Sequence, residues 1–171
     1  GVKLRQWMVS LGSTATTMPI KNEWIENETI KFFTKLSYSG FSSIEFKRHD
    51  INGNYYMIEP TVGRTDQQEY VATLNGVNLP LIAYNSLTGL NIQDDKIKTG
   101  PVIYIDEWAE ILSVAVHLKR KLLTIRQWYK SIQGYRAYRF WNNGDKKVFL
   151  ASFYINLRKL ILKSSNFINE R

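Results

Sequence analysis

The sequence predicts an α+β fold, in which helices flank an antiparallel sheet. Stretches with the period of a strand alternate along the chain with stretches that have the period of a helix. At the centre, residues 41–48 and 54–61 form a strand pair around Asn52-Gly53, a dipeptide typical of hairpin turns. The 171 residues are 44% hydrophobic, which is the composition of a folded globular chain. Together these features indicate about one domain with a hairpin at its centre.

The first forty residues predict two strands and a helix. Residues 1–18 are rich in threonine and interrupted by Gly12, which indicates a strand, a turn and a second strand. Asn22 is a suitable cap for a helix over residues 23–38, where apolar side chains recur at helical spacing. Gly40 ends this helix, so the central hairpin follows directly.

The part that follows the hairpin predicts two further helices and a loop. Asp66 is a candidate cap for a helix that ends near Gly76. A second helix is predicted to begin close to Pro80 and to end near Gly89. The polar residues 91–100 are predicted to form a loop.

The last seventy residues predict one short strand and three helices. The strand covers residues 102–106 and the helices cover 107–118, 124–132 and 146–163. Asp106 and Glu107 fit the start of the first of these helices, where acidic side chains favour the helix dipole. No repeat or low-complexity tract occurs in the sequence.

Charge is divided unevenly along the chain. Residues 119–171 carry thirteen Lys or Arg against two Asp or Glu, whereas residues 1–118 carry ten against thirteen. Such asymmetry predicts a basic segment with an anionic partner or a separate unit. We therefore expect a first domain over residues 1–100 and a basic helical extension over 101–171 that packs on it.

Composition excludes several classes of site. The absence of cysteine excludes disulfides, thiolate metal sites and cysteine nucleophiles. The two histidines, His49 and His117, are far apart in sequence, which disfavours a histidine-rich metal cluster within the chain. There is no apolar run long enough to cross a membrane and no signal-peptide pattern, so a cytoplasmic location is expected.

The hairpin allows two registers. A two-residue turn at Asn52-Gly53 directs Glu45 and Glu59 to opposite faces of the strand pair. A three-residue loop that includes Ile51 pairs Asp50 with Asn54 and brings Glu45 directly across from Glu59. The pattern of apolar residues favours the three-residue loop.

Two carboxylates at directly opposed cross-strand positions repel one another unless a cation lies between them. Such oxygen pairs suit Mg²⁺, which proteins hold through one or two carboxylates together with substrate phosphates. The alternative is a solvated face of the hairpin on which Lys47 relieves the repulsion. The residues alone leave both interpretations open.

Several short motifs occur in a fixed order over residues 1–90. They are Lys3-Leu4-Arg5, Gly12-Ser13-Thr14, the Glu45-Phe46-Lys47-Arg48 strand, Ile58-Glu59, and Gly76-Val77-Asn78-Leu79-Pro80 followed by Ala83-Tyr84. In this order they resemble the ATP-grasp superfamily, specifically the D-aspartate-ligase-like branch of its carboxylate–amine ligases. The resemblance covers only the C-terminal part of that catalytic domain.

This resemblance implies an ATP-dependent ligase. It would form an acyl phosphate from a carboxylate, and an amine would then attack it to give an amide, with release of ADP and phosphate. Glu45, Glu59 and Thr61 would hold Mg²⁺ against the phosphates of ATP. The predicted partners are ATP, a small carboxylate, an amine, and an N-terminal lobe of the same protein that completes the nucleotide site.

Basic side chains would contact the nucleotide or the reacting groups. Lys3 and Arg5 alternate with Leu4 along a strand and are expected to point toward the cleft. The resemblance implies that Lys3, Arg5 and Thr61 bind the nucleotide, and that Arg5 and Arg64 have catalytic roles.

The chain departs from the family pattern at two positions. Thr61 replaces an asparagine, and Arg64 lies one residue later than the family arginine. These departures favour an alternative, a degenerate protein that binds nucleotide or a partner without turnover.

The basic segment has its own alternatives. Aromatic residues are interleaved with the Lys and Arg residues of 119–171. They would serve to pack this segment onto the acidic part of the chain, to contact an anionic membrane from the inner face, or to stack on single-stranded nucleic acid. Packing is the favoured interpretation and nucleic acid the least favoured.

Overall fold

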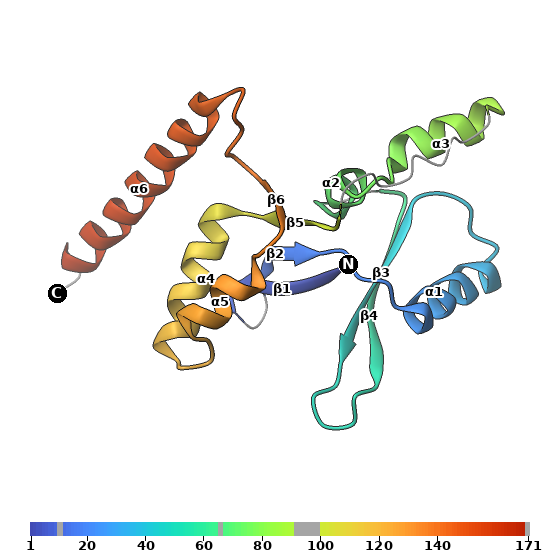
Figure 1. Ribbon diagram of the computed structural model, residues 1–171, viewed down its shortest axis with the longest axis horizontal. Coiled ribbons are helices and arrows are strands. Elements are labelled where there is room, and N and C mark those ends of the chain that lie inside the picture. Colours follow the sequence, from blue (N-terminus) through green and yellow to red (C-terminus); the bar gives the residue numbers. More distant parts are fainter. Residues whose placement is uncertain (10–11, 65–66, 91–99, 170–171) are drawn as a thin grey trace. The chain divides into compact units, whose positions relative to one another are not determined.

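The computed structural model describes residues 1–9, 12–64, 67–90 and 100–169, without the side chains of 67–68 and 160–169. The elements, in chain order, are β1 (Val2–Trp7), β2 (Ser13–Met18), α1 (Glu23–Lys35), β3 (Ser42–Arg48), β4 (Tyr55–Val62), α2 (Gln67–Leu74), α3 (Leu79–Thr88), β5 (Val102–Ile105), α4 (Glu107–Lys119), α5 (Ile125–Ser131), β6 (Tyr135–Tyr138) and α6 (Lys146–Asn169) (Figure 1). The predicted cap Asp66 and most of the predicted loop 91–100 lie outside the described residues. The fold is α+β, as the sequence predicts.

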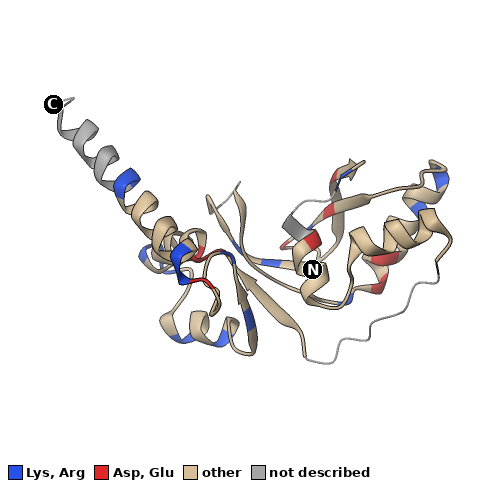
Figure 2. Ribbon diagram, turned by 90° about the horizontal axis from the view of Figure 1, so that it is seen from above, with Lys and Arg blue, Asp and Glu red and all other residues tan. Residues whose placement is uncertain are grey.

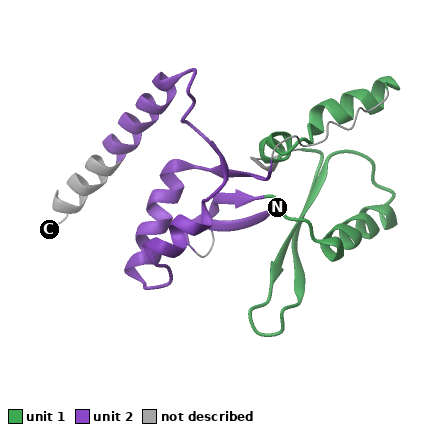
Figure 3. Ribbon diagram, viewed as in Figure 1, with its two compact units in different colours: residues 1, 19–99 green, residues 2–18, 100–171 purple. Residues whose placement is uncertain are grey.

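The chain divides into two compact units (Figure 3). Unit 1 contains Gly1 and residues 19–99, and unit 2 contains residues 2–18 and 100–171. The boundary at residues 99–100 lies close to the expected one, whereas β1 and β2 belong to unit 2. Residues 101–171 contain, besides helices, the predicted strand β5 and the strand β6.

Unit 2 is built on a four-stranded sheet in the order β1-β2-β5-β6. The pairs β1–β2 and β2–β5 are antiparallel, whereas β5 and β6 run parallel. The expectation of an antiparallel sheet is therefore wrong for β6, which the sequence analysis does not predict. A parallel pair requires a crossover, and α4 and α5 provide it between β5 and β6.

Helices α4 and α5 cover one face of this sheet. Ile103 and Ile105 of β5 form a buried cluster with Ile132, against which Met18, Trp128 and Tyr138 pack. On the same face, Thr16 of β2 donates a hydrogen bond to Glu110 of α4. The packed aromatic side chains of this cluster support the interpretation that aromatic residues of 119–171 serve packing.

The start of α4 anchors the chain that follows β6. Asp106 caps the helix, as predicted, by accepting a hydrogen bond from the backbone N–H of Ala109 at 3.1 Å. The carboxylate of Glu107 accepts hydrogen bonds from three consecutive backbone N–H groups, those of Arg139, Phe140 and Trp141, at 2.7–3.2 Å. The Arg139 guanidinium donates to Asp106 at 2.6 Å, and this hydrogen bond raises the pKa of Arg139, which stays charged.

Unit 1 contains the β3–β4 hairpin and three helices. Asn22 caps α1 through the backbone N–H of Ile25, as the sequence predicts. Asn78 caps α3 in the same way through the N–H of Leu81. The α3 helix ends at Gly89, whose φ of 70° is a left-handed conformation that favours glycine.

Candidate metal and nucleotide site

The β3–β4 hairpin places Glu45 directly across from Glu59. Ser43 and Thr61 are the next pair on the same face, because residues two apart along a strand share a face. The predicted register of the two glutamates is therefore present in the structure. Both glutamates are exposed residues.

The hairpin reaches this register by a different route from the predicted one. His49 N–H donates to the carbonyl of Asn54 at 2.8 Å, and residues 50–53 form a four-residue loop. Phe46 pairs with Met57, and the preceding residue of β3, Glu45, pairs with Glu59. Ile58 of β4 is therefore an extra residue without a partner on β3. Such a bulge shifts the register by one residue, which restores the pairing of Glu45 with Glu59.

Aromatic packing accounts for the bulge. Trp24 of α1 lies with its ring centroid 6.0 Å from that of Phe46 and 5.6 Å from that of Tyr55. Phe46 and Tyr55 share a face only in the register next to the loop, where Met57 pairs with Phe46. The bulge therefore lets the hairpin pack one face on Trp24 while it presents Glu45 and Glu59 together on the other face.

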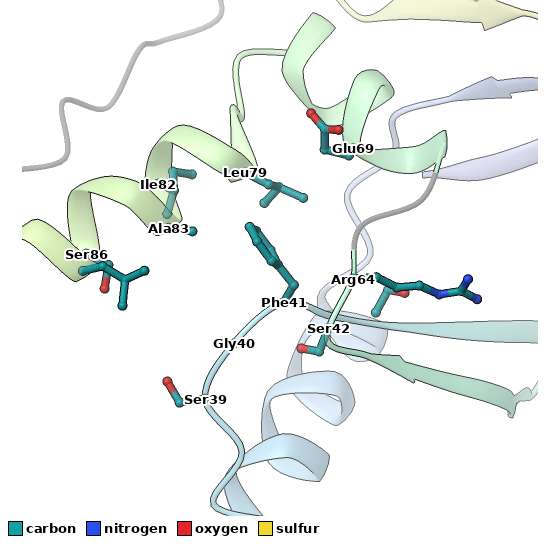
Figure 4. Close-up of a pocket in the computed structure, with 12 residues that line it drawn as sticks. Ser39, Gly40, Phe41, Ser42, Arg64, Glu69, Leu79, Ile82, Ala83 and Ser86 are labelled. Atoms are coloured by element: carbon teal, nitrogen blue, oxygen red, sulfur yellow. The ribbon is translucent and has the colours of Figure 1, made fainter.

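Arg64 follows the end of β4 at the edge of a cavity within unit 1. Gly63 has a φ of 76°, and its N–H donates to the carbonyl of Phe41 and to the hydroxyl of Tyr38, both at 2.9 Å. The cavity has a volume of about 490 Å³, and Phe41, Leu79 and Ile82 line its apolar part. Figure 4 shows the guanidinium of Arg64 directed away from these apolar side chains.

Arg5 is expected to point toward the cleft, but its side chain points into the core of unit 2. It is buried on β1, where its Nε donates to Oε1 of Glu110 at 2.7 Å and its Nη1 donates to Ser131 at 2.7 Å. A bulge at Leu4 interrupts the alternation on which the prediction rested. Lys3, on the same strand, is exposed as expected.

Glu110 is a central residue that the sequence analysis does not identify. Its side chain is about 5% exposed, and its two oxygens accept hydrogen bonds from Arg5, from Trp128 Nε1 at 2.9 Å and from Thr16 at 2.6 Å. Helical spacing places Glu110 on one face with Ser113 and Val114, and the structure buries all three residues.

The predicted site residues therefore fall into two groups. Glu45, Glu59, Thr61 and Arg64 lie on or next to one hairpin of unit 1, whereas Lys3 and Arg5 belong to the sheet of unit 2. Within the described residues no group of three or more His, Cys, Asp or Glu side chains is placed to hold a metal ion. The candidate metal site thus consists of two carboxylates and the Thr61 hydroxyl.

Comparisons with known proteins gave no match. No family model matches the chain, and no curated protein and no solved structure matches it either. None of the helices in the described part of the chain has the length and the apolar composition needed to cross a bilayer.

Proposed function

We propose that this chain contributes the metal-binding hairpin of an ATP-dependent carboxylate–amine ligase of the ATP-grasp type. The observation that carries the proposal is the register of β3 and β4, which puts Glu45 and Glu59 directly opposite each other on an exposed face. Directly opposed like charges destabilise a strand pair. A cation held between the two carboxylates would relieve this repulsion.

The donor atoms fit Mg²⁺. Magnesium prefers hard oxygen ligands, and it is usually bound through one or two carboxylates together with substrate phosphates. Glu45 and Glu59 would supply the carboxylates, and Thr61 lies two residues beyond Glu59 on the same face. When bound, Mg²⁺ would neutralise charge on the phosphates of ATP.

Among the side chains of this chain, Arg64 is the one that we propose contacts a phosphate. It is exposed and follows a glycine with a left-handed backbone conformation, at the end of the strand that carries Glu59. Its guanidinium suits the oxygens of a phosphate or an acyl phosphate. Arg5 is not part of the proposed site, because Glu110 already neutralises it in the interior of unit 2.

The proposed reaction joins a carboxylate to an amine. The carboxylate attacks the γ-phosphorus of ATP, the bond between that phosphorus and the β,γ-bridging oxygen breaks, and ADP leaves. The amine nitrogen then attacks the acyl carbon and loses a proton, and phosphate leaves as the amide forms. The hairpin would contribute charge stabilisation and positioning, which are the main contributions a protein makes to phosphoryl transfer.

Binding of Mn²⁺ tests the site on the 171-residue chain. Electron paramagnetic resonance of Mn²⁺ reports the free ion. We expect Glu45→Gln and Glu59→Gln each to weaken Mn²⁺ binding about tenfold or more, because each removes a ligand charge. Glu26→Gln, at an exposed glutamate of α1 in the same unit, is the matched control and should bind as the unmodified chain does.

Turnover separates the ligase from the degenerate alternative. In a protein that carries the whole catalytic domain, Glu59→Gln should abolish the release of ADP that depends on an amine acceptor. Metal-dependent ATP binding without any amine-dependent ADP release in the unmodified protein would favour the degenerate alternative. Unchanged turnover in Glu59→Gln would refute the assignment of Glu59 to the metal.

A further inference from the structure

We propose that helix α6 binds the surface of an anionic membrane through a narrow apolar stripe formed by Leu150, Tyr154 and Leu157. This inference does not depend on the proposed ligase function. It rests on how α6 is attached to unit 2, on what its outer side exposes and on the charges that flank that side.

Helix α6 is attached to unit 2 along one side. Ser152 is buried and accepts a hydrogen bond from Trp108 Nε1 at 2.9 Å. The ring of Phe153 lies 5.4 Å from that of Trp108, and the ring of Phe149 lies 5.2 Å from that of Trp141. Phe149 and Ser152 therefore mark the side of α6 that faces its own unit, and Phe153, which is 45% exposed, lies at the edge of that side.

The stripe lies on the opposite side of the helix. At about 100° per residue, Leu150, Tyr154 and Leu157 are roughly 140–200° around the helix from Ser152. Their exposed fractions are 63%, 65% and 43%. Three large apolar or aromatic side chains at this spacing form a continuous face, and burial of such side chains from water is favourable.

Cations flank both edges of the stripe. Lys146 lies on one edge, and Lys147 and Arg158 lie on the other, within about 40° of the stripe. Residues 146–169 contain no Asp or Glu, and Figure 2 shows blue but no red on the part of α6 that it colours by charge. Long basic side chains at the edge of an apolar face can place their charges among anionic headgroups while the apolar residues enter the acyl boundary.

The charge pattern selects an anionic surface over a second copy of the chain. Two α6 helices paired through their stripes would bring their flanking cations together, with no carboxylate of α6 between them. An anionic lipid surface instead pairs with every flanking cation. Tyr154 also suits a membrane interface, because its ring is apolar and its hydroxyl is polar.

Co-sedimentation of the 171-residue chain with lipid vesicles tests the proposal. We expect the partition constant to be about tenfold or more higher for vesicles with about one third phosphatidylserine than for pure phosphatidylcholine. Raising the salt from about 0.1 M to about 0.5 M should reduce this difference, because exposed charges are then screened. Equal pelleting with and without anionic vesicles would overturn the proposal.

Two matched double variants locate the contact on the helix. Leu150→Gln with Leu157→Gln should lower the partition constant about tenfold or more, since it removes apolar area from the stripe. Val148→Gln with Ile155→Gln changes two residues of similar exposure, 49% and 51%, outside the stripe and should change it less than about twofold. Equal losses in both variants would refute the stripe.

A variant that removes only charge tests the electrostatic part of membrane binding without removing apolar area from the helix. Lys147→Gln with Arg158→Gln should weaken binding about tenfold at low salt and little at high salt. Circular dichroism checks that each variant keeps its helix content. If light scattering shows a dimer that only the stripe variant disrupts, without vesicle binding, the occupant is a second copy and the membrane proposal is wrong.

Discussion

The buried ion pair of unit 2 joins Arg5 of β1 to Glu110 of α4, and both side chains are about 5% exposed. Glu110 also accepts hydrogen bonds from Thr16 and Trp128, so a single carboxylate connects two strands and two helices. One nitrogen of Arg5, Nη2, is buried without a hydrogen-bond partner in the described structure. Arg5 therefore depends on Glu110 for most of its charge compensation.

Removal of Glu110 tests this dependence. Glu110→Ala leaves the Arg5 charge buried and unpaired, so we expect the free energy of unfolding of unit 2 to fall by about 3–5 kcal/mol. Urea unfolding followed by the indole N–H signal of Trp128, which lies in unit 2, measures the change. Arg126→Ala, at an exposed residue of α5 in the same unit, is the control and should cost less than about 1 kcal/mol.

The position of Arg5 shows what the sequence leaves undetermined at the scale of a residue. Its partner Glu110 is 105 residues away, and no local pattern around Arg5 indicates that pairing. The bulge at Leu4 also breaks the alternation from which its direction is predicted. By contrast, the caps Asn22 and Asp106 are correctly predicted, because capping depends on residues only a few positions apart.

Among the elements, the hairpin is predictable in part. The sequence predicts the pairing of Glu45 with Glu59 from a three-residue loop, whereas the structure reaches it through a longer loop and a bulge. The four-residue loop and the bulge at Ile58 do not follow from the sequence of the two strands, because they depend on the packing of Trp24 from another element. The sequence analysis does not predict strand β6 for a similar reason. Its four residues form a strand by pairing in parallel with β5, which is distant in sequence.

Glu107 fixes the segment between β6 and α6. Its carboxylate accepts hydrogen bonds from the backbone N–H groups of Arg139, Phe140 and Trp141, which would otherwise donate to water. Glu107→Ala should therefore accelerate hydrogen exchange of the Phe140 and Trp141 amides about tenfold or more and destabilise unit 2 by about 1–3 kcal/mol. The Arg139 amide should change less, because it also donates to the carbonyl of Ile105 at 3.0 Å. Exchange measured by nuclear magnetic resonance tests this expectation.

The amides of β1 and β2 serve as an internal control in the same spectra. They pair with each other in the sheet and should keep their protection in Glu107→Ala. A uniform acceleration over all of unit 2 would show that Glu107 stabilises the unit as a whole, and would contradict a local role.

At the scale of the whole molecule, the two units have separate buried residues. In unit 1 the buried side chains include Phe33 and Val71, whereas Ile103, Ile105 and Ile132 form the cluster of unit 2. Separate cores allow separate unfolding transitions, for which a single free energy of unfolding is not defined. The five tryptophan indole N–H groups provide probes in both units.

We expect Glu110→Ala to shift the urea midpoint of the Trp128 indole signal and to leave that of Trp24 unchanged. Trp128 donates directly to Glu110, and Trp24 packs on the hairpin of unit 1. Two-dimensional ¹H–¹⁵N spectra across a urea series measure both midpoints. A coincident shift of the two signals would contradict independent units.

The order of the strands in the sheet of unit 2 has a consequence for biosynthesis. Strands β1 and β2 leave the ribosome before unit 1, but their neighbour β5 begins only at Val102, after all of unit 1. At about 5–20 residues per second, the wait for β5 is roughly 4–16 s. Unit 1 is then a contiguous insert that can fold during translation, while the nascent β1–β2 edge waits for its partner. A chaperone that shields this edge would protect the stage of synthesis most exposed to aggregation.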